Sequence, residues 1–153
     1  MRTEKQNINL EKLANYLISL PEDYEHFSME SFYYLKGVND FTLPGLRAEK
    51  DYKELIKLNK CGTVACAVGH GPAAGIPLRN FKSWWSYSNK SFTNDNKEWE
   101  WCFGGGWYIV DDTARGAGVR IKALLGGIVL GDIEDIVDYS SSYDLEDLEE
   151  TYL

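Results

Sequence analysis

The sequence predicts an α+β fold, a single compact domain of residues 1–153 in which several helices pack on a small antiparallel sheet. Three observations support this prediction. The chain has 153 residues, the length of one domain. Apolar residues recur at helical spacing in several segments. The tryptophan-rich segment at about 98–110 instead alternates with a period of two.

The first half of the chain is predicted to be mainly helical. Near the N-terminus, Asn9 is a candidate helix cap and Pro21 ends the helical pattern. The apolar residues between them lie on one helix face: Leu10, Leu13, Ala14, Leu17 and Ile18. A second amphipathic helix is predicted over residues 48–60, and a short aromatic helix near Trp84.

The segment KEWEWCFGGGWYIVDD predicts a β-hairpin at about residues 98–110. Its side chains follow a period of two on both sides of three central glycines, which would form the loop. One face of the hairpin is aromatic and apolar: Trp99, Trp101, Phe103, Trp107 and Ile109. That face is either the main core beneath the helices or a surface on which a nucleobase stacks.

The last predicted elements are helices. TARGAGVRIKALLGG reads as a helix capped by Thr113, and Gly126 is expected to close it in a left-handed conformation. The segment that follows, residues 132–153, is expected to form two short helices around DIEDIVDY and YDLEDLEETYL.

The net charge of −8 comes from the C-terminal segment, about residues 132–153, which holds nine acidic residues and no lysine or arginine. The other 131 residues carry 16 basic and 15 acidic groups and sum to +1. This distribution excludes the basic stripe that duplex nucleic acid requires. It does not exclude the binding of a small anion by the nearly neutral residues 1–131. The acidic segment is either an element that engages a basic partner or a solvated face.

The sequence also predicts the compartment. MRTEKQNINL lacks the apolar run of a signal peptide, and the longest weakly polar segment is far shorter than a membrane span. We therefore expect a cytoplasmic protein without membrane contact. Three cysteines, an odd number, predict reduced thiols instead of a disulfide framework.

The segment CGTVACAVGHGPAAG, residues 61–75, admits several interpretations. Cys61 lies before a predicted helix start, where a thiolate is stabilised, and His70 is the candidate base of a hydrolase or transferase. The alternative is that Cys61 and Cys66 only pack. A zinc site would need Cys61, Cys66, His70 and Cys102, but their spacing is unlike that of structural sites, so no metal is predicted. The glycines match no phosphate-binding loop, and no cofactor is predicted.

Four segments together resemble a known group of sequences: PEDYEHF, CGTVACAVGHGPAAGI, WCF with GGW, and DDTARGAGVRIKALL. They are similar to a family of small uncharacterised proteins from tailed-phage and bacterial genomes. The resemblance covers about three quarters of the chain and brings with it no activity, cofactor or catalytic residue. It implies a phage or mobile-element accessory protein.

The start of the helix at Thr113 is a candidate anion site. Arg115 lies in the first turn, where free N–H groups and the helix dipole favour an anion, and Arg120 follows in the next turns. Trp101 and Trp107 are the candidate aromatic contacts. The alternative is that Asp111 and Asp112 neutralise the positive field.

These observations predict a non-enzymatic phage-type protein that inhibits or sequesters a host component, such as a counter-defence inhibitor or a nucleotide-signal sponge. Its partner is expected to be a host protein or a small nucleotide-like anion. The alternative function is a cysteine-dependent hydrolase or transferase that uses Cys61 and His70.

Overall fold

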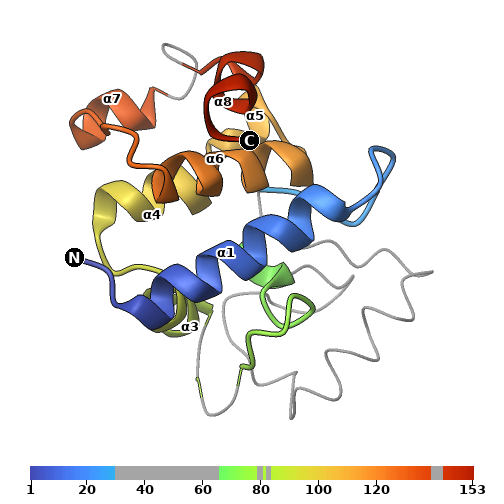
Figure 1. The fold of residues 1–153 in the computed structure, drawn as a ribbon, viewed down its shortest axis with the longest axis vertical. Helices are drawn as coiled ribbons and strands as arrows, with labels where there is room; N and C mark the ends of the chain where they lie inside the picture. The colour runs from blue at the N-terminus through green and yellow to red at the C-terminus, as the bar shows by residue number, and fades with distance from the viewer. Residues whose placement is uncertain (30–65, 79–80, 82–83, 139–142) are drawn as a thin grey trace.

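The structure is a computed structural model, and it describes residues 1–29, 66–78, 81, 84–138 and 143–153. The described residues are mainly helical and contain no strand (Figure 1). In chain order the elements are α1 (Glu4–Ser19), the 3₁₀ turn η1 (Val68–His70), α3 (Trp84–Ser91), α4 (Asn96–Phe103), α5 (Trp107–Val110), α6 (Ala114–Leu125), α7 (Ile133–Val137) and α8 (Leu145–Tyr152). The helix predicted over residues 48–60 lies outside the described residues.

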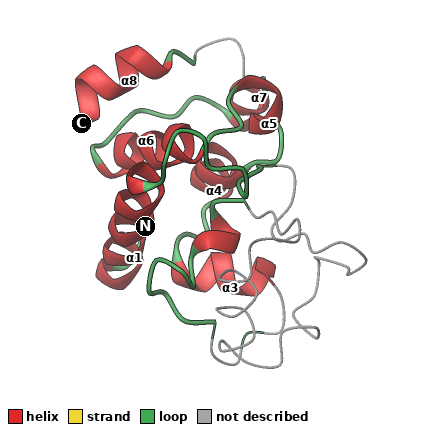
Figure 2. Ribbon diagram, turned by 90° about the vertical axis from the view of Figure 1, so that its right-hand side faces the viewer, coloured by secondary structure: helices red, strands yellow, loops and turns green. Residues whose placement is uncertain are grey.

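Helix α6 is the centre of the fold. Nine of its twelve residues are buried, because it packs against α1, α4 and α8. Figures 1 and 2 show α1 on one side of α6 and α8 on the other. A helix that is buried on most of its faces needs small residues to let its neighbours approach, and ARGAG supplies them.

The contact between α1 and α6 is close at Gly118. A Cβ atom on Gly118 would lie 2.7 Å from Ile18 Cγ1 and 3.0 Å from the Ala14 carbonyl oxygen. Ala14 itself is fully buried, as are the leucines of α1 that face the core. The two backbones therefore approach each other through a glycine and an alanine.

The N-terminal helix is confirmed, but it begins earlier than predicted. Thr3 is the N-cap, and it forms a capping box with Gln6. Asn9, the predicted cap, lies inside the helix, where its buried amide donates to the Ser91 carbonyl at 2.9 Å. Asn9 thus joins α1 to the end of α3.

The predicted β-hairpin at 98–110, and with it the α+β fold class, is wrong. The segment forms two helices, α4 and α5, separated by the glycines at 104–106. Asp95 caps α4 by accepting hydrogen bonds from the N–H groups of Lys97 and Glu98. The period of two in EWEWCF coincides with an i, i+3, i+4 helical pattern, and the cap and the packing decide for the helix.

The helical geometry divides the aromatic face that the hairpin would have presented. Trp99 and Phe103, one turn apart, contact each other edge to face, and Phe103 also contacts Phe92. Trp101 faces α6 instead and donates its indole N–H to the Arg120 carbonyl at 2.9 Å. Trp107 lies on the separate helix α5.

The helix at Thr113 and the two short helices of the acidic segment are confirmed. Gly126 caps α6 in a right-handed conformation, and the left-handed residue is Gly127, with φ of 89°. From Gly127 the chain leaves α6 and runs to α7 through residues 128–131, which we call the connector. Helix α8 then returns to pack on α6.

Replacing Gly118 with alanine tests the close approach of α1 and α6. Alanine is normally favoured over glycine inside a helix by about 1 kcal/mol. Here the added methyl group meets Ile18 and the Ala14 carbonyl, so we expect Gly118→Ala to lower the free energy of unfolding by about 1–3 kcal/mol in urea denaturation.

Ile18→Ala removes the closer of these two contacts. The double variant should therefore lose less stability than the sum of the two single variants. A Gly118→Ala protein that is more stable than the original chain would contradict the packing.

Candidate functional site

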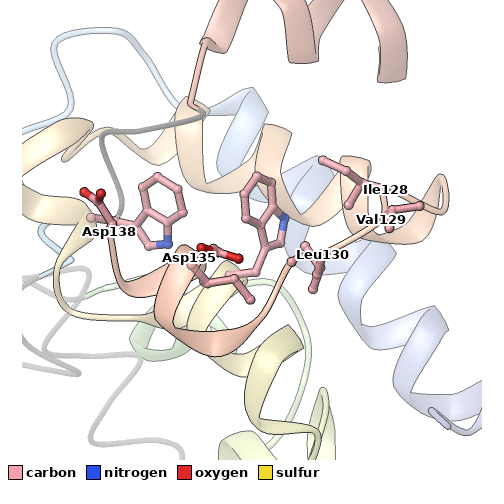
Figure 3. A pocket seen from close by; sticks show the side chains of 9 residues that line it. Ile128, Val129, Leu130, Asp135 and Asp138 are labelled. Atoms are coloured by element: carbon pink, nitrogen blue, oxygen red, sulfur yellow. The ribbon is translucent and has the colours of Figure 1, made fainter.

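A pocket of about 230 Å³, which we call the aromatic pocket, lies where α4, α5, the connector and α7 meet (Figure 3). Figure 3 shows Asp138 at one end, Asp135 near the middle and the apolar connector residues at the other end. The described residues that line it are Trp101, Trp107, Ile128, Val129, Leu130, Gly131, Asp135, Ile136 and Asp138. Its size suits a side chain or a small fragment more than a large ligand.

The two tryptophans are held rigidly in place. Trp101 donates to the Arg120 carbonyl, and Trp107 donates to the Glu100 carbonyl at 3.1 Å. Their rings meet nearly perpendicular, with centroids 5.5 Å apart. Both indole N–H groups already donate within the protein, and the two residues are only 7% (Trp101) and 1% (Trp107) exposed, so the rings border the pocket with a small apolar area.

The connector forms the apolar wall. Ile128 and Leu130 are partly buried and pack on the core, whereas Val129 between them is 93% exposed. This alternation is typical of an extended chain, in which successive side chains point to opposite sides.

The polar groups of the aromatic pocket are carboxylates. Asp135 lies on α7 and Asp138 is the C-cap of that helix, and both line the pocket. Asp135 also accepts the Asp132 N–H at 3.3 Å, which holds the start of α7. None of the described residues that line the pocket is basic. The aromatic pocket is therefore negatively charged above an aromatic floor.

Arg120 lies behind this floor and is fully buried. Its Cζ is 4.3 Å from the centroid of the Trp107 ring and 5.7 Å from that of Tyr143, distances at which a cation is attracted to an aromatic face. Its Nη1 is 3.8 Å from Asp111 Oδ2 and 3.4 Å from the Tyr143 hydroxyl. Within the described part of the chain, Nε and Nη2 of Arg120 have no hydrogen-bond partner.

Asp111 is the carboxylate that compensates the buried charge. It accepts the Tyr143 hydroxyl at 2.6 Å, and its other oxygen accepts the N–H and hydroxyl of Thr113. Burial lowers the pKa of the Arg120 guanidinium, and Tyr143 and Asp111 oppose that shift. Burial also raises the pKa of Tyr143, against the effect of Arg120, so its hydroxyl keeps the proton that it donates.

The structure places the five residues predicted to bind a ligand in different surroundings. Trp101 and Trp107 line the aromatic pocket, and Arg120 lies beneath Trp107. Thr113 caps α6 by accepting the Gly116 N–H at 3.0 Å. Arg115 is on the surface, where its Nε is 2.6 Å from Glu149 Oε1 of α8.

The predicted anion site at the start of α6 is thus not assembled as one cluster. The Asp111 carboxylate lies against Gly116 in the first turn of α6, so a carboxylate already faces these N–H groups. A phosphate would have to displace Asp111 from this position and Glu149 from Arg115. Asp112 lies apart from them and accepts the Met29 N–H and the Ser28 hydroxyl.

His70, the predicted base, is buried and has both ring nitrogens engaged. Nδ1 is 2.8 Å from the Cys66 carbonyl and must donate to it, so Nε2 of the neutral ring accepts the Tyr24 hydroxyl at 3.1 Å. Burial lowers the pKa of His70 to about 4, and the bond to Cys66 opposes this shift. Cys61, its predicted nucleophile, lies outside the described residues.

The remaining candidate ligands also lie apart. Cys102 is buried, and burial raises the pKa of its thiol to about 12, so it stays protonated at neutral pH. Across the described ranges, no group of three or more histidine, cysteine, aspartate or glutamate side chains is placed to hold a metal.

Sequence reasoning missed the carboxylates and the connector. In the sequence, Asp135 and Asp138 are two of the nine acids of the acidic segment, and nothing in their spacing distinguishes them as lining a pocket. The connector, by contrast, had a signal. Its apolar residues stand between Gly127 and Gly131, as a short extended segment would.

No family model, curated protein or solved structure matches the chain. Among the helices that the structure describes, none is long and apolar enough to cross a membrane.

The pKa of His70 predicts how stability depends on pH. The unfolded chain protonates this residue near pH 6.5, whereas the folded chain does so only near pH 4. The stability contributed by the neutral ring is thus present above pH 6.5 and is lost as pH falls to 4. We expect a loss of roughly 3 kcal/mol from this residue.

The measurement compares urea denaturation of the original chain and of His70→Gln from pH 7.5 to 4. The difference in unfolding free energy between the two proteins should shrink as pH falls, because only the original chain carries the titrating ring. A difference that does not change with pH would contradict the assignment.

Proposed function

We propose that the protein is a non-enzymatic binding protein that occupies a partner protein, and that the aromatic pocket takes a lysine or arginine side chain of that partner. The observation that carries the proposal is the combination of the Trp101 and Trp107 floor with the Asp135 and Asp138 carboxylates. A long basic side chain satisfies both, because its stem is apolar and its head is cationic.

Charge favours this ligand over an anion. The carboxylates of the aromatic pocket repel a phosphate, and the indole N–H groups beside it already donate to carbonyls. The acidic segment 132–153 extends the negative field around the pocket and attracts a basic partner over longer distances. Of the two partners expected from the sequence, a host protein fits better than a nucleotide-like anion.

The groups with large pKa shifts support binding over catalysis. His70, Cys102 and Tyr143 are displaced from their ordinary pKa values, and none of them lines the aromatic pocket. The alternative function, with Cys61 as nucleophile, gains no support from His70, whose two nitrogens are engaged with Cys66 and Tyr24.

The resemblance to phage accessory proteins agrees with a partner from the host. Such a protein acts by covering a basic surface that the host protein uses for something else. Occupation of that surface, without chemistry, is sufficient for inhibition.

Nuclear magnetic resonance with single amino acid derivatives tests the pocket. We expect Nα-acetyl-arginine N-methylamide and its lysine counterpart to shift the indole N–H signals of Trp101 and Trp107, with a Kd on the order of 1 mM for an isolated side chain. The glutamate counterpart and inorganic phosphate should leave both signals unchanged.

Matched variants distinguish binding in the aromatic pocket from attraction by the overall negative charge of the protein. Asp135→Asn and Asp138→Asn should each weaken binding severalfold or more. Glu146→Gln removes the same charge from the exposed face of α8 and should leave the Kd nearly unchanged. Binding of phosphate or of the glutamate derivative at the tryptophans would contradict the proposal.

A further inference from the structure

The connector has unused backbone hydrogen-bonding groups. The Ile128 N–H donates to the Ala123 carbonyl, which completes the turn after α6. Beyond it, the N–H groups of Val129, Leu130 and Gly131 donate to no acceptor in the described chain, and the carbonyls of these residues accept no hydrogen bond there. Within the described chain, the connector therefore has three consecutive residues with unpaired backbone groups, and its alternating burial is that of an extended segment. Such a segment favours the addition of another strand.

Two pockets meet at this edge. The aromatic pocket shares Ile128 and Leu130 with a second pocket of about 320 Å³. The second pocket has mixed charge, and its other described lining residues are Arg2, Asp95, Lys97, Glu98, Leu124 and Gly127. Ile128 and Leu130 therefore border both pockets, while Val129, which also lines the aromatic pocket, is 93% exposed.

This arrangement matches the geometry of an added strand. Residues two apart in an extended chain present their N–H and carbonyl groups on the same edge, so Val129 and Gly131 share one edge. In a paired strand, the residue opposite Val129 points outward with it. Its two neighbours point inward, toward the pockets that Ile128 and Leu130 border.

We propose that an extended segment of the partner protein pairs antiparallel with the connector through Val129 and Gly131. This inference rests on the proposed function and gives the partner segment a pattern. A lysine or arginine enters the aromatic pocket against Asp135 and Asp138. An apolar, preferably β-branched residue follows opposite Val129, and the next residue lies over the second pocket.

The charge of the protein argues against a second copy as the occupant. Pairing two connectors would bring together two acidic segments and two copies of the Asp135 and Asp138 carboxylates. These like charges would repel each other, whereas a basic segment would be attracted. The occupant is therefore a segment of another protein.

The probe is the acetylated and amidated peptide Thr-Lys-Val-Lys-Thr, titrated into isotopically labelled protein. Binding should protect the Val129 and Gly131 amide protons from exchange while it shifts the Trp101 and Trp107 indole signals. Val129→Pro, which removes one donor, should weaken binding by about tenfold relative to Val129→Ala, which removes only side-chain atoms. Val129 is exposed, so both variants are expected to fold.

Methylated peptides give a second, independent test that leaves the protein unchanged. Methylation of the central valine nitrogen removes a donor that faces the connector and should weaken binding by about tenfold. Methylation of a lysine nitrogen, which faces away, should change the Kd by no more than about twofold.

The outcomes separate the two proposals. If Asp135→Asn abolishes peptide binding while Val129→Pro and the valine-methylated peptide bind normally, strand pairing is overturned and the binding of a basic side chain in the aromatic pocket stands. If neither the peptide nor the single amino acid derivatives bind, both proposals are overturned. If the protein alone forms a dimer that protects the connector amides, the occupant is a second copy and this proposal is overturned.

Discussion

The structure depends on the burial of one positive charge. Arg120 lies inside the fold on α6, the helix that α1, α4 and α8 contact, and removing a guanidinium from water is costly unless a partner compensates it. Asp111 supplies the compensating carboxylate, while Tyr143 and Trp107 cover the guanidinium. The Arg120 side chain thus contacts three segments: the residues before α6, helix α5 and the chain before α8.

The same compensation shapes the aromatic pocket. Trp107 lies over the guanidinium, and Trp101 donates to the carbonyl of the same arginine, so the floor of the aromatic pocket is fixed before any ligand arrives. Preorganisation of this kind lowers the cost of binding. Asp111 compensates Arg120 inside the fold, and Asp135 and Asp138 are the carboxylates that we propose contact a ligand. The protein therefore separates a structural cation, Arg120, from the cation that we propose it binds.

Much of the helical structure could be predicted from local chemistry, and the hairpin error shows where this approach stops. Thr113 correctly predicted the start of α6, and the acidic segment contains the two helices that were predicted for it. EWEWCF satisfies two periods at once, and the choice depends on packing against Phe92 and α6, which are distant contacts. Arg120 was predicted to help bind an anion, and its burial could not be predicted from local spacing. The burial depends on Asp111 and on Tyr143, 23 residues further along the chain.

The most direct test of this account is a double-mutant cycle on Arg120 and Asp111, read by urea denaturation. Asp111→Asn leaves a buried charge uncompensated and should cost about 3–5 kcal/mol. Arg120→Met keeps most of the volume, so the double variant should recover a large part of that loss and still bind the arginine derivative at the aromatic pocket. Additive losses in the two single variants would contradict the central role of the buried charge.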